Sequence, residues 1–154
     1  MRLVFRADTR GPTEIFGTGF QPRFPGGINI TEGGQMTGGV STSKDLGVSL
    51  RYAAAYGGWL YALWVTNEVD VLDYLSKKGY KDAFRNAMSQ MEIAAESIPG
   101  EHVIGARRAR QQGDNAEMYG AVEVNAHCTV GQREKDLGLA YLNTDVTVGK
   151  AYAR

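Results

Sequence analysis

The distribution of apolar residues along the chain predicts strands and helices that alternate. Apolar runs at residues 3–7 and 59–65 have the length and composition of strands, and the second is typical of a central strand covered on both faces. Between them, apolar residues recur at helical spacing over 44–56, with Ser43 or Asp45 placed to cap the start and a Gly-Gly pair to end the helix. The pattern therefore predicts a sheet with this helix packed against it.

Weaker patterns fill the rest of the chain. A short helix is predicted at residues 13–16 with Thr13 as its cap, and the glycine-rich segment 24–39 reads as a loop, either a surface connection or a place where backbone approaches a ligand. Further along, the sequence predicts a short strand or turn at 69–72, a polar connection (a crossing between elements) at 76–81 and a partial helix at 83–88. Strands are predicted at 90–95, 102–105 and 118–124. Residues 129–154 carry too little pattern for an element to be predicted.

Length and composition narrow the class of protein. A chain of 154 residues predicts a single domain over 1–154, which we expect to be monomeric. The 17 basic and 17 acidic side chains cancel, so no overall field attracts nucleic acid or an anionic membrane. The sequence contains no apolar run typical of a signal peptide or a membrane span, no zinc-binding spacing, and a single cysteine, Cys128. We therefore expect a soluble protein without a membrane partner or a bound metal.

The segment from Phe5 to Glu14 concentrates charge on a short apolar strand and the turn after it. Arg6 and Arg10 each offer a planar fork of donors suited to phosphate, and Asp8 can accept from a ribose hydroxyl. This combination is what binding a charged dinucleotide requires. For Arg6 alone, a surface cation on an edge strand is the alternative.

Two more motifs follow in order: Ser41-Thr42-Ser43 before the central helix, and Gln90-x-Glu92 at the start of a later strand. Together with the first segment, with residues 19–23 (Gly-Phe-Gln-Pro-Arg) and with Ile-Pro at 98–99, they cover about two thirds of the chain. In this order the motifs resemble the cholera-toxin and pertussis-toxin class of mono-ADP-ribosyltransferases. The resemblance implies an α+β fold in which a split pair of β-sheets with flanking helices encloses a cleft for NAD, the substrate, with no metal.

The resemblance also implies roles for individual residues. Glu92 stabilises the positive charge that develops on the nicotinamide ribose, and Gln90 orients the acceptor. Both side chains are expected to reach the cleft, since alternate positions of a strand face the same side of the sheet. Ser41 holds the catalytic glutamate, although a capping or turn role is the alternative for that serine alone. The implied catalytic residues are Arg6, Ser41, Gln90 and Glu92, and the implied nucleotide-binding residues are Arg6, Asp8, Arg10, Ser41 and Thr42. Thr42 and Ser43 are also placed to hold the strand end and cap the helix.

Glutamine rather than glutamate at position 90 implies an acceptor other than arginine. We expect transfer of ADP-ribose to a protein side chain, with water as a competing acceptor that would give NAD glycohydrolase side activity. One alternative is a guanine-specific transferase acting on DNA or RNA, and another is a degenerate domain that binds NAD or a partner without turnover. Two basic clusters bear on the nucleic-acid alternative, either as phosphate contacts or as solvated faces: Lys77, Lys78, Lys81 and Arg85, and Arg107, Arg108 and Arg110.

The remaining expectations concern biology and individual side chains. The resemblance implies a bacterial toxin or effector that is secreted or delivered and acts in the target-cell cytoplasm, with an immunity protein as a further partner. Position 87 is alanine where several members with glutamine carry an aromatic residue, so acceptor recognition does not carry over. His102 and His127 read as structural or surface residues. The four aromatic residues Tyr52, Tyr56, Trp59 and Trp64 are predicted in the core or at the cleft rim, where one of them could stack on nicotinamide.

Overall fold

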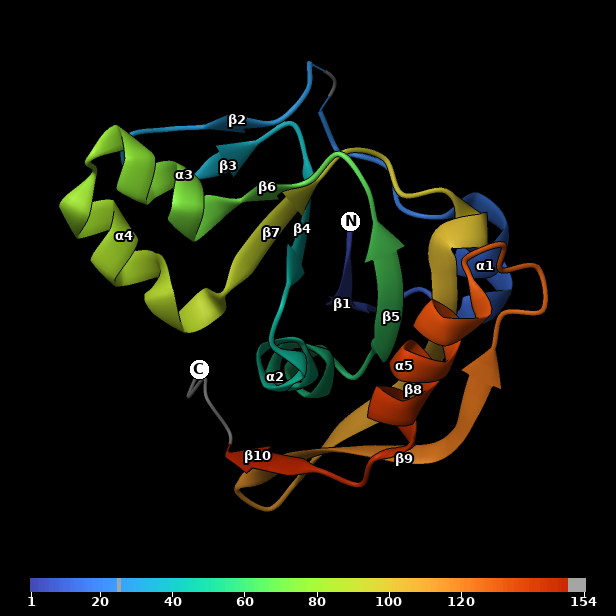
Figure 1. The fold of residues 1–154 in the computed structure, drawn as a ribbon. Helices are drawn as coiled ribbons and strands as arrows, with labels where there is room; N and C mark the ends of the chain where they lie inside the picture. The colour runs from blue at the N-terminus through green and yellow to red at the C-terminus, as the bar shows by residue number, and fades with distance from the viewer. Residues whose placement is uncertain (25, 150–154) are drawn as a thin grey trace.

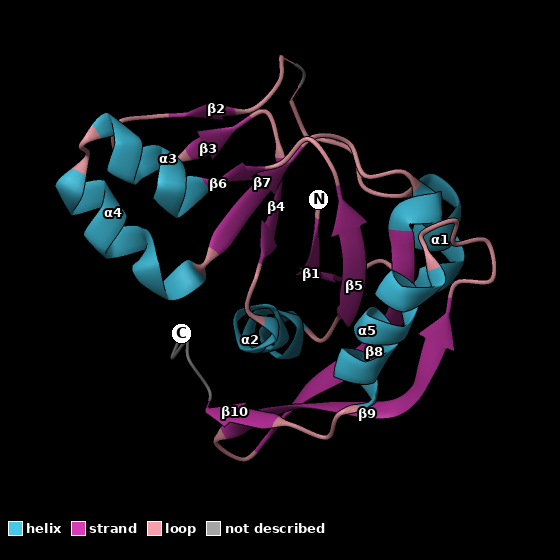
Figure 2. Ribbon diagram, viewed as in Figure 1, coloured by secondary structure: helices cyan, strands magenta, loops and turns pink. Residues whose placement is uncertain are grey.

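The computed structural model describes residues 1–24 and 26–149, and it is built on one large antiparallel sheet with helices on both faces (Figures 1 and 2). Its strands are β1 (Arg2–Asp8), β2 (Asn29–Ile30), β3 (Met36–Thr37), β4 (Val40–Ser43), β5 (Trp59–Val65), β6 (Val69–Asp70), β7 (Glu92–Ala95), β8 (Val103–Gln112), β9 (Asn115–Val124) and β10 (Thr147–Gly149). Its helices are α1 (Pro12–Thr18), α2 (Leu46–Tyr56), α3 (Val71–Lys78), α4 (Lys81–Ala87) and α5 (Gln132–Asn143), with short 3-10 turns η1 (Met88–Gln90) and η2 (Gly100–His102). The predicted α+β fold is confirmed.

The sheet consists of two halves that meet at one point. Its strand order is β10-β9-β8-β5-β1-β4-β7-β6, and β1 pairs with β5 along its whole length. In contrast, β1 pairs with β4 only where Phe5 faces Ser43. The strands diverge on either side of that position, so the half ending at β1 and the half beginning at β4 enclose space between them.

Three apolar clusters hold the helices on this sheet. Phe5, Leu50 and Leu142 belong to the cluster under α2 and α5, and Ile15 with Tyr61 belongs to the cluster on the opposite face, under α1. The third cluster lies between α3, α4 and the β2–β3 hairpin and contains Ile30, Val71, Leu75, Ala83 and Ala94. Among the described residues, no helix has both the length and the apolar character that crossing a membrane would require.

Several sequence predictions are confirmed closely. The strand at 59–65 is β5, fully enclosed between β1 and β8. The central helix begins after Asp45, whose side chain accepts a hydrogen bond from the N–H of Gly47 at 2.8 Å. It ends at Gly57, which adopts the left-handed conformation that favours glycine (φ 69°). The predicted strand 3–7 and the helical segment 83–88 correspond to β1 and α4.

Other predictions are wrong, each for a local reason. The polar crossing at 76–81 overlaps helix α3, which is capped by Asp70 at one end and by left-handed Gly79 at the other, and buries Val71 and Leu75 one turn apart. Helix α1 is capped by Gly11, with proline at its first position, and not by Thr13. The loop 24–39 contains the β2–β3 hairpin, anchored by buried Ile30.

The C-terminal segment that showed no pattern contains helix α5 and strand β10 (Figure 1). Gly138 of α5 lies so close to β8 that a Cβ there would stand 2.8 Å from the Ile104 side chain. This close approach explains the missing signal, because a glycine at the contact contributes no hydrophobic residue to the pattern. Residues 150–154 lie outside the described part of the chain.

Candidate functional site

A cavity of about 500 Å³ lies where β1 and β4 diverge, under one face of α2. This volume falls in the range of small-molecule sites. Its walls are formed by residues 5–9 of β1 and the following turn, by Ser41, Thr42 and Ser43 of β4, by Val48, Ser49, Tyr52, Ala53 and Tyr56 of α2, and by Gly58, Gln90 and Glu92. Six of the seven polar residues nominated from the sequence line this cavity: Arg6, Asp8, Ser41, Thr42, Gln90 and Glu92.

Arg6 links the two diverging strands. Its guanidinium donates a hydrogen bond of 2.7 Å from Nη1 to the backbone carbonyl of Ser41 and stands 5.2 Å from the ring centre of Phe20. Its Nε is buried and has no hydrogen-bond partner among the described residues. Burial lowers the pKa of Arg6, and the nearby carboxylate of Asp8 offsets part of that effect. The group is thus a partly desolvated cation held in place at the cavity wall, a suitable contact for an anion.

Asp8 and Arg10 form a two-pronged ion pair. The Nε and Nη2 atoms of Arg10 donate to the two carboxylate oxygens of Asp8 at 2.9 and 2.8 Å. Burial raises the pKa of Asp8, but the hydrogen bonds and charge of Arg10 outweigh it and bring the pKa below its usual value. Arg10 itself is not among the residues that line the cavity, and its backbone carbonyl accepts from the hydroxyl of Tyr61 at 2.6 Å. Arg10 therefore holds Asp8 in this structure.

Strands β4 and β7 bring Ser41 to Glu92. The two strands pair from Val40–Ala95 to Ser43–Glu92, and the hydroxyl of Ser41 donates a hydrogen bond to the carboxylate of Glu92. The hydroxyl of Thr42 is buried and donates to the backbone carbonyl of Ile93 at 2.7 Å. Ser41 thus orients a carboxylate at the cavity wall, whereas the Thr42 hydroxyl holds the strand pair together.

Gln90 does not lie on the strand with Glu92, so the prediction that both belong to one strand is wrong. It ends the turn η1, and Met91 has a left-handed backbone (φ 47°), which breaks the alternation before β7 begins. Both side chains nevertheless line the cavity. Ser43 donates to the backbone carbonyl of Gln90 at 2.7 Å, and the hydroxyl of Tyr52 donates to its side-chain oxygen at 3.0 Å.

Sequence reasoning missed three supporting residues. Tyr52 was expected only in the core or rim, Ser43 only as a strand-end or capping residue, and Phe20 only as part of a motif. Phe20 and Ser43 carry no simple signal, because each acts through a residue distant in the sequence. Tyr52 does carry a signal in its spacing. It lies three residues after Ser49 and four before Tyr56, so all three share the helix face that lines the cavity.

The two basic clusters are partly engaged elsewhere. Lys77 pairs with Asp73 one turn away at 2.9 Å, and Arg107 donates to the backbone carbonyls of Gly120 and Leu142. Arg108 stacks 4.7 Å from the ring centre of Trp59. Arg107 is therefore a structural residue.

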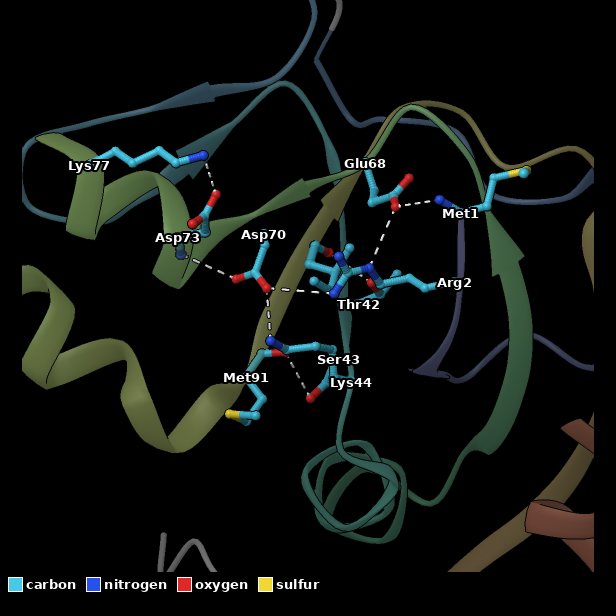
Figure 3. A network of polar contacts seen from close by, with 11 residues as sticks. Met1, Arg2, Thr42, Ser43, Lys44, Glu68, Asp70, Asp73, Lys77 and Met91 are labelled. Atoms are coloured by element: carbon cyan, nitrogen blue, oxygen red, sulfur yellow. Dashed lines mark hydrogen bonds and ion pairs between the residues drawn. The ribbon is translucent and has the colours of Figure 1, made fainter. Parts of the chain in front are cut away.

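A polar network connects the start of β1 with β6 and with the residue that follows β4. Figure 3 shows Asp70 between the side chains of Arg2 and Lys44, at 3.5 and 2.8 Å. Glu68 completes the network by contacting Arg2 and the N-terminal ammonium of Met1. Since Arg2 belongs to β1 and Lys44 directly follows β4, Asp70 joins the two halves of the sheet.

The assembled site can bind an anion beside a carboxylate. Its elements are a partly desolvated guanidinium, a second carboxylate held by an arginine, and a serine that orients Glu92. Within residues 1–24 and 26–149, no group of three or more histidine, cysteine or acidic side chains is placed to hold a metal ion.

No model of a known protein family matches the sequence, and no curated protein matches it. Solved structures do resemble it. A guanine-specific ADP-ribosyltransferase superposes with a TM-score of 0.66 at 20% identity, over 85% of this chain and 80% of that one. A single-substitution variant of the Scabin toxin from Streptomyces scabies gives 0.63 at 21% identity, over 85% and 78%. The protein EcPltA gives 0.63 at 19% identity, over 84% and 88%. At these identities the likeness establishes the fold: the chain has the fold of ADP-ribosyltransferases, several of which are toxins.

Proposed function

We propose that this chain is a mono-ADP-ribosyltransferase of the cholera-toxin and pertussis-toxin class that transfers ADP-ribose from NAD to a protein side chain other than arginine. One observation carries the proposal: Arg6 donates to the backbone of Ser41, and Ser41 donates from its side chain to Glu92. Residues from three separate motifs thus form one continuous chain of hydrogen bonds at the wall of a cavity.

The residues present fit NAD as substrate. The buried Nε of Arg6, without a partner in the described structure, suits a phosphate oxygen of the diphosphate, and the carboxylate of Asp8 suits a ribose hydroxyl. A cavity of about 500 Å³ accommodates the nicotinamide ribose and diphosphate at its walls.

Glu92 carries the chemistry. When the bond between the ribose C1′ and the nicotinamide nitrogen breaks, its electron pair leaves with the ring nitrogen and positive charge develops on the sugar. A carboxylate oriented by Ser41 stabilises that charge through a preset geometry that needs no reorganisation. The acceptor heteroatom then bonds to C1′ and releases its proton to solvent, and water as acceptor gives the glycohydrolase side reaction.

A second candidate acceptor is guanine in DNA or RNA. It is favoured by one observation, the likeness of the fold to a protein described as a guanine-specific ADP-ribosyltransferase. Against it stand the absence of net charge and the engagement of Arg107 in structural contacts. We therefore place the protein acceptor first.

We also propose a biological role for this chain. The fold is shared with toxins, including one from Streptomyces scabies, which supports a bacterial toxin or effector delivered into the cytoplasm of a target cell. An immunity protein would then protect the producing cell.

Incubation with labelled NAD and a cell lysate tests the function. We expect nicotinamide release and label in a protein band, and we expect Glu92→Ala to lower both by at least about 100-fold because it removes the charge-stabilising carboxylate. Glu96→Ala is the matched control, since Glu96 is exposed just beyond the same strand and should leave activity unchanged.

The alternatives give different results. Label in nucleic acid would support the guanine-specific transferase, and release of nicotinamide without any labelled macromolecule would contradict transfer. No turnover at all would leave the degenerate binding domain as the better explanation.

A further inference from the structure

Tyr52 lines the cavity from α2 and reaches across it to Gln90. Its hydroxyl donates to the side-chain oxygen of Gln90 at 3.0 Å. We propose that Tyr52 is a positioning residue that fixes the orientation of the Gln90 amide, so that its nitrogen end faces the incoming acceptor. This inference rests on the proposed transferase function and specifies which residue makes transfer, as opposed to hydrolysis, efficient.

The need for such a residue follows from the chemistry of an amide. A glutamine side chain ends in an oxygen that accepts and a nitrogen that donates, and its terminal torsion is broad and roughly two-fold. Without a partner of fixed polarity, the two ends exchange places with little cost. A tyrosine hydroxyl that donates to the oxygen selects one orientation, in which the nitrogen points to the opposite side.

Two neighbouring residues set the backbone around Gln90. Ser43 holds the backbone carbonyl of Gln90 at 2.7 Å, and the left-handed Met91 sets the direction in which the chain leaves the turn. The contact between Gln90 Nε2 and the hydroxyl of Ser89 is long, at 3.4 Å. Among these contacts, the bond from Tyr52 is the short one that acts on the end of the side chain.

Two different elements therefore hold the two residues of the Gln90-x-Glu92 motif. Ser41 of β4 orients the Glu92 carboxylate, and Tyr52 of α2 orients the Gln90 amide. Removal of the tyrosine hydroxyl leaves the β4–β7 pairing and the Ser41 bond intact. Cleavage of the bond to nicotinamide depends on Glu92, whereas bonding of the acceptor heteroatom to C1′, with loss of its proton to solvent, depends on Gln90. The two steps should respond differently to the loss of that hydroxyl.

Substitution Tyr52→Phe tests this division. We expect nicotinamide release in the absence of acceptor, and KM for NAD, to stay within about twofold of wild type, and transfer of label to the acceptor to fall at least about tenfold. Tyr119→Phe is the matched control: Tyr119 lies on β9, stacks on Arg110 and does not line the cavity, so both rates should stay unchanged.

A second measurement does not depend on turnover. In a nitrogen–proton NMR spectrum, the two side-chain amide protons of Gln90 should have distinct, sharp resonances in the wild type and should broaden or shift in Tyr52→Phe, with no change in Tyr119→Phe.

The outcomes separate this inference from the function on which it rests. Unchanged transfer in Tyr52→Phe, or a parallel fall in transfer and hydrolysis, would overturn the positioning role while the wild-type activity still supports the transferase. A wild-type protein that releases no nicotinamide overturns the function itself, and the positioning role with it.

Discussion

At the scale of single residues, the two arginines of the first motif rest on one aromatic ring. The guanidinium carbons of Arg6 and Arg10 stand 5.2 and 5.7 Å from the ring centre of Phe20. Phe20 is buried and packs edge-on against Tyr61 at 5.3 Å. Because a ring face attracts cations, Phe20 sets the position of both guanidinium groups from behind the cavity.

Phe20→Leu should therefore weaken binding of NAD. We expect Kd to rise about five- to tenfold, which corresponds to about 1 kcal/mol, because a leucine keeps much of the apolar contact but loses the ring face. Isothermal titration calorimetry with NAD measures the change. Phe16→Leu is the control, since Phe16 also packs edge-on against Tyr61, at 6.5 Å, while in the described structure both arginines stack on Phe20. An equal loss of affinity in both variants would contradict the role of the ring.

At the scale of elements, helix α1 is attached to the rest of the molecule through a glycine. Gly19 ends the helix with a positive φ of 66°, and Phe20 then exchanges two backbone hydrogen bonds of 2.8 Å with Ile98. A Cβ at Gly19 would overlap the backbone carbonyl oxygen of Ile98. This junction fixes α1 and also the ring of Phe20.

Gly19→Ala should lower the free energy of unfolding by about 2–4 kcal/mol, because it combines an unfavourable φ with a backbone clash. Gly17→Ala, inside the same helix with open space where the added Cβ would lie, should raise the free energy of unfolding by up to about 1 kcal/mol. Urea unfolding measures both. Similar stabilities for the two variants would show that the contact with Ile98 is not tight.

Some helices and strands could be predicted from the sequence alone and others could not. Helix α2 and strand β5 were predictable because their apolar patterns and caps are local. Helix α5 was not, since it approaches the sheet at Gly138, where a Cβ would stand 2.8 Å from the Ile104 side chain. The turn at Met91 was not either, because a left-handed conformation is uncommon for a residue other than glycine and leaves no mark in the sequence.

The residues of the candidate site also fall into those that the sequence identified and those that it did not. Residues nominated through the family resemblance line one cavity, with Arg10 behind it. Their supports, Phe20 and Tyr52, were not recognised as such. Both act across tertiary contacts, to Arg6 and Gln90, and the helical spacing of Tyr52 does not identify Gln90 as its partner.

At the scale of the whole molecule, the two halves of the sheet are held together by charge as well as by backbone pairing. Burial raises the pKa of Asp70, but hydrogen bonds from Lys44 and from the backbone N–H of Asp73 outweigh this and lower the pKa below its usual value of 3.8. The folded state thus favours the ionised carboxylate. The contribution of Asp70 to stability is present above pH 3.8, the usual pKa of the group. It is lost as the pH falls through the lowered pKa of the folded state.

Asp70→Asn should lower the free energy of unfolding at neutral pH by about 1 kcal/mol, since asparagine can still cap α3 but cannot pair with Lys44 and Arg2. The difference in free energy of unfolding between this variant and wild type should become smaller as the pH falls below 3.8. Urea unfolding across that range measures it. Asp45→Asn, at the equivalent cap of α2, should change stability by less than about 0.5 kcal/mol. A difference for Asp70→Asn that does not vary with pH would contradict the ionic origin.

The one paired position between β1 and β4 also marks the place where backbone pairing resists bending of the sheet least. A sheet bends most readily where the fewest hydrogen bonds cross it, and here Phe5 and Ser43 form the only paired position between the two strands in the described structure. Arg6 and Asp8 move with one half, and Ser41, Gln90 and Glu92 move with the other. A small rotation about that position would widen or narrow the mouth of the cavity, resisted by the Arg6–Ser41 hydrogen bond and by the ion pairs of Asp70, and a molecule that touches both walls would act as a brace.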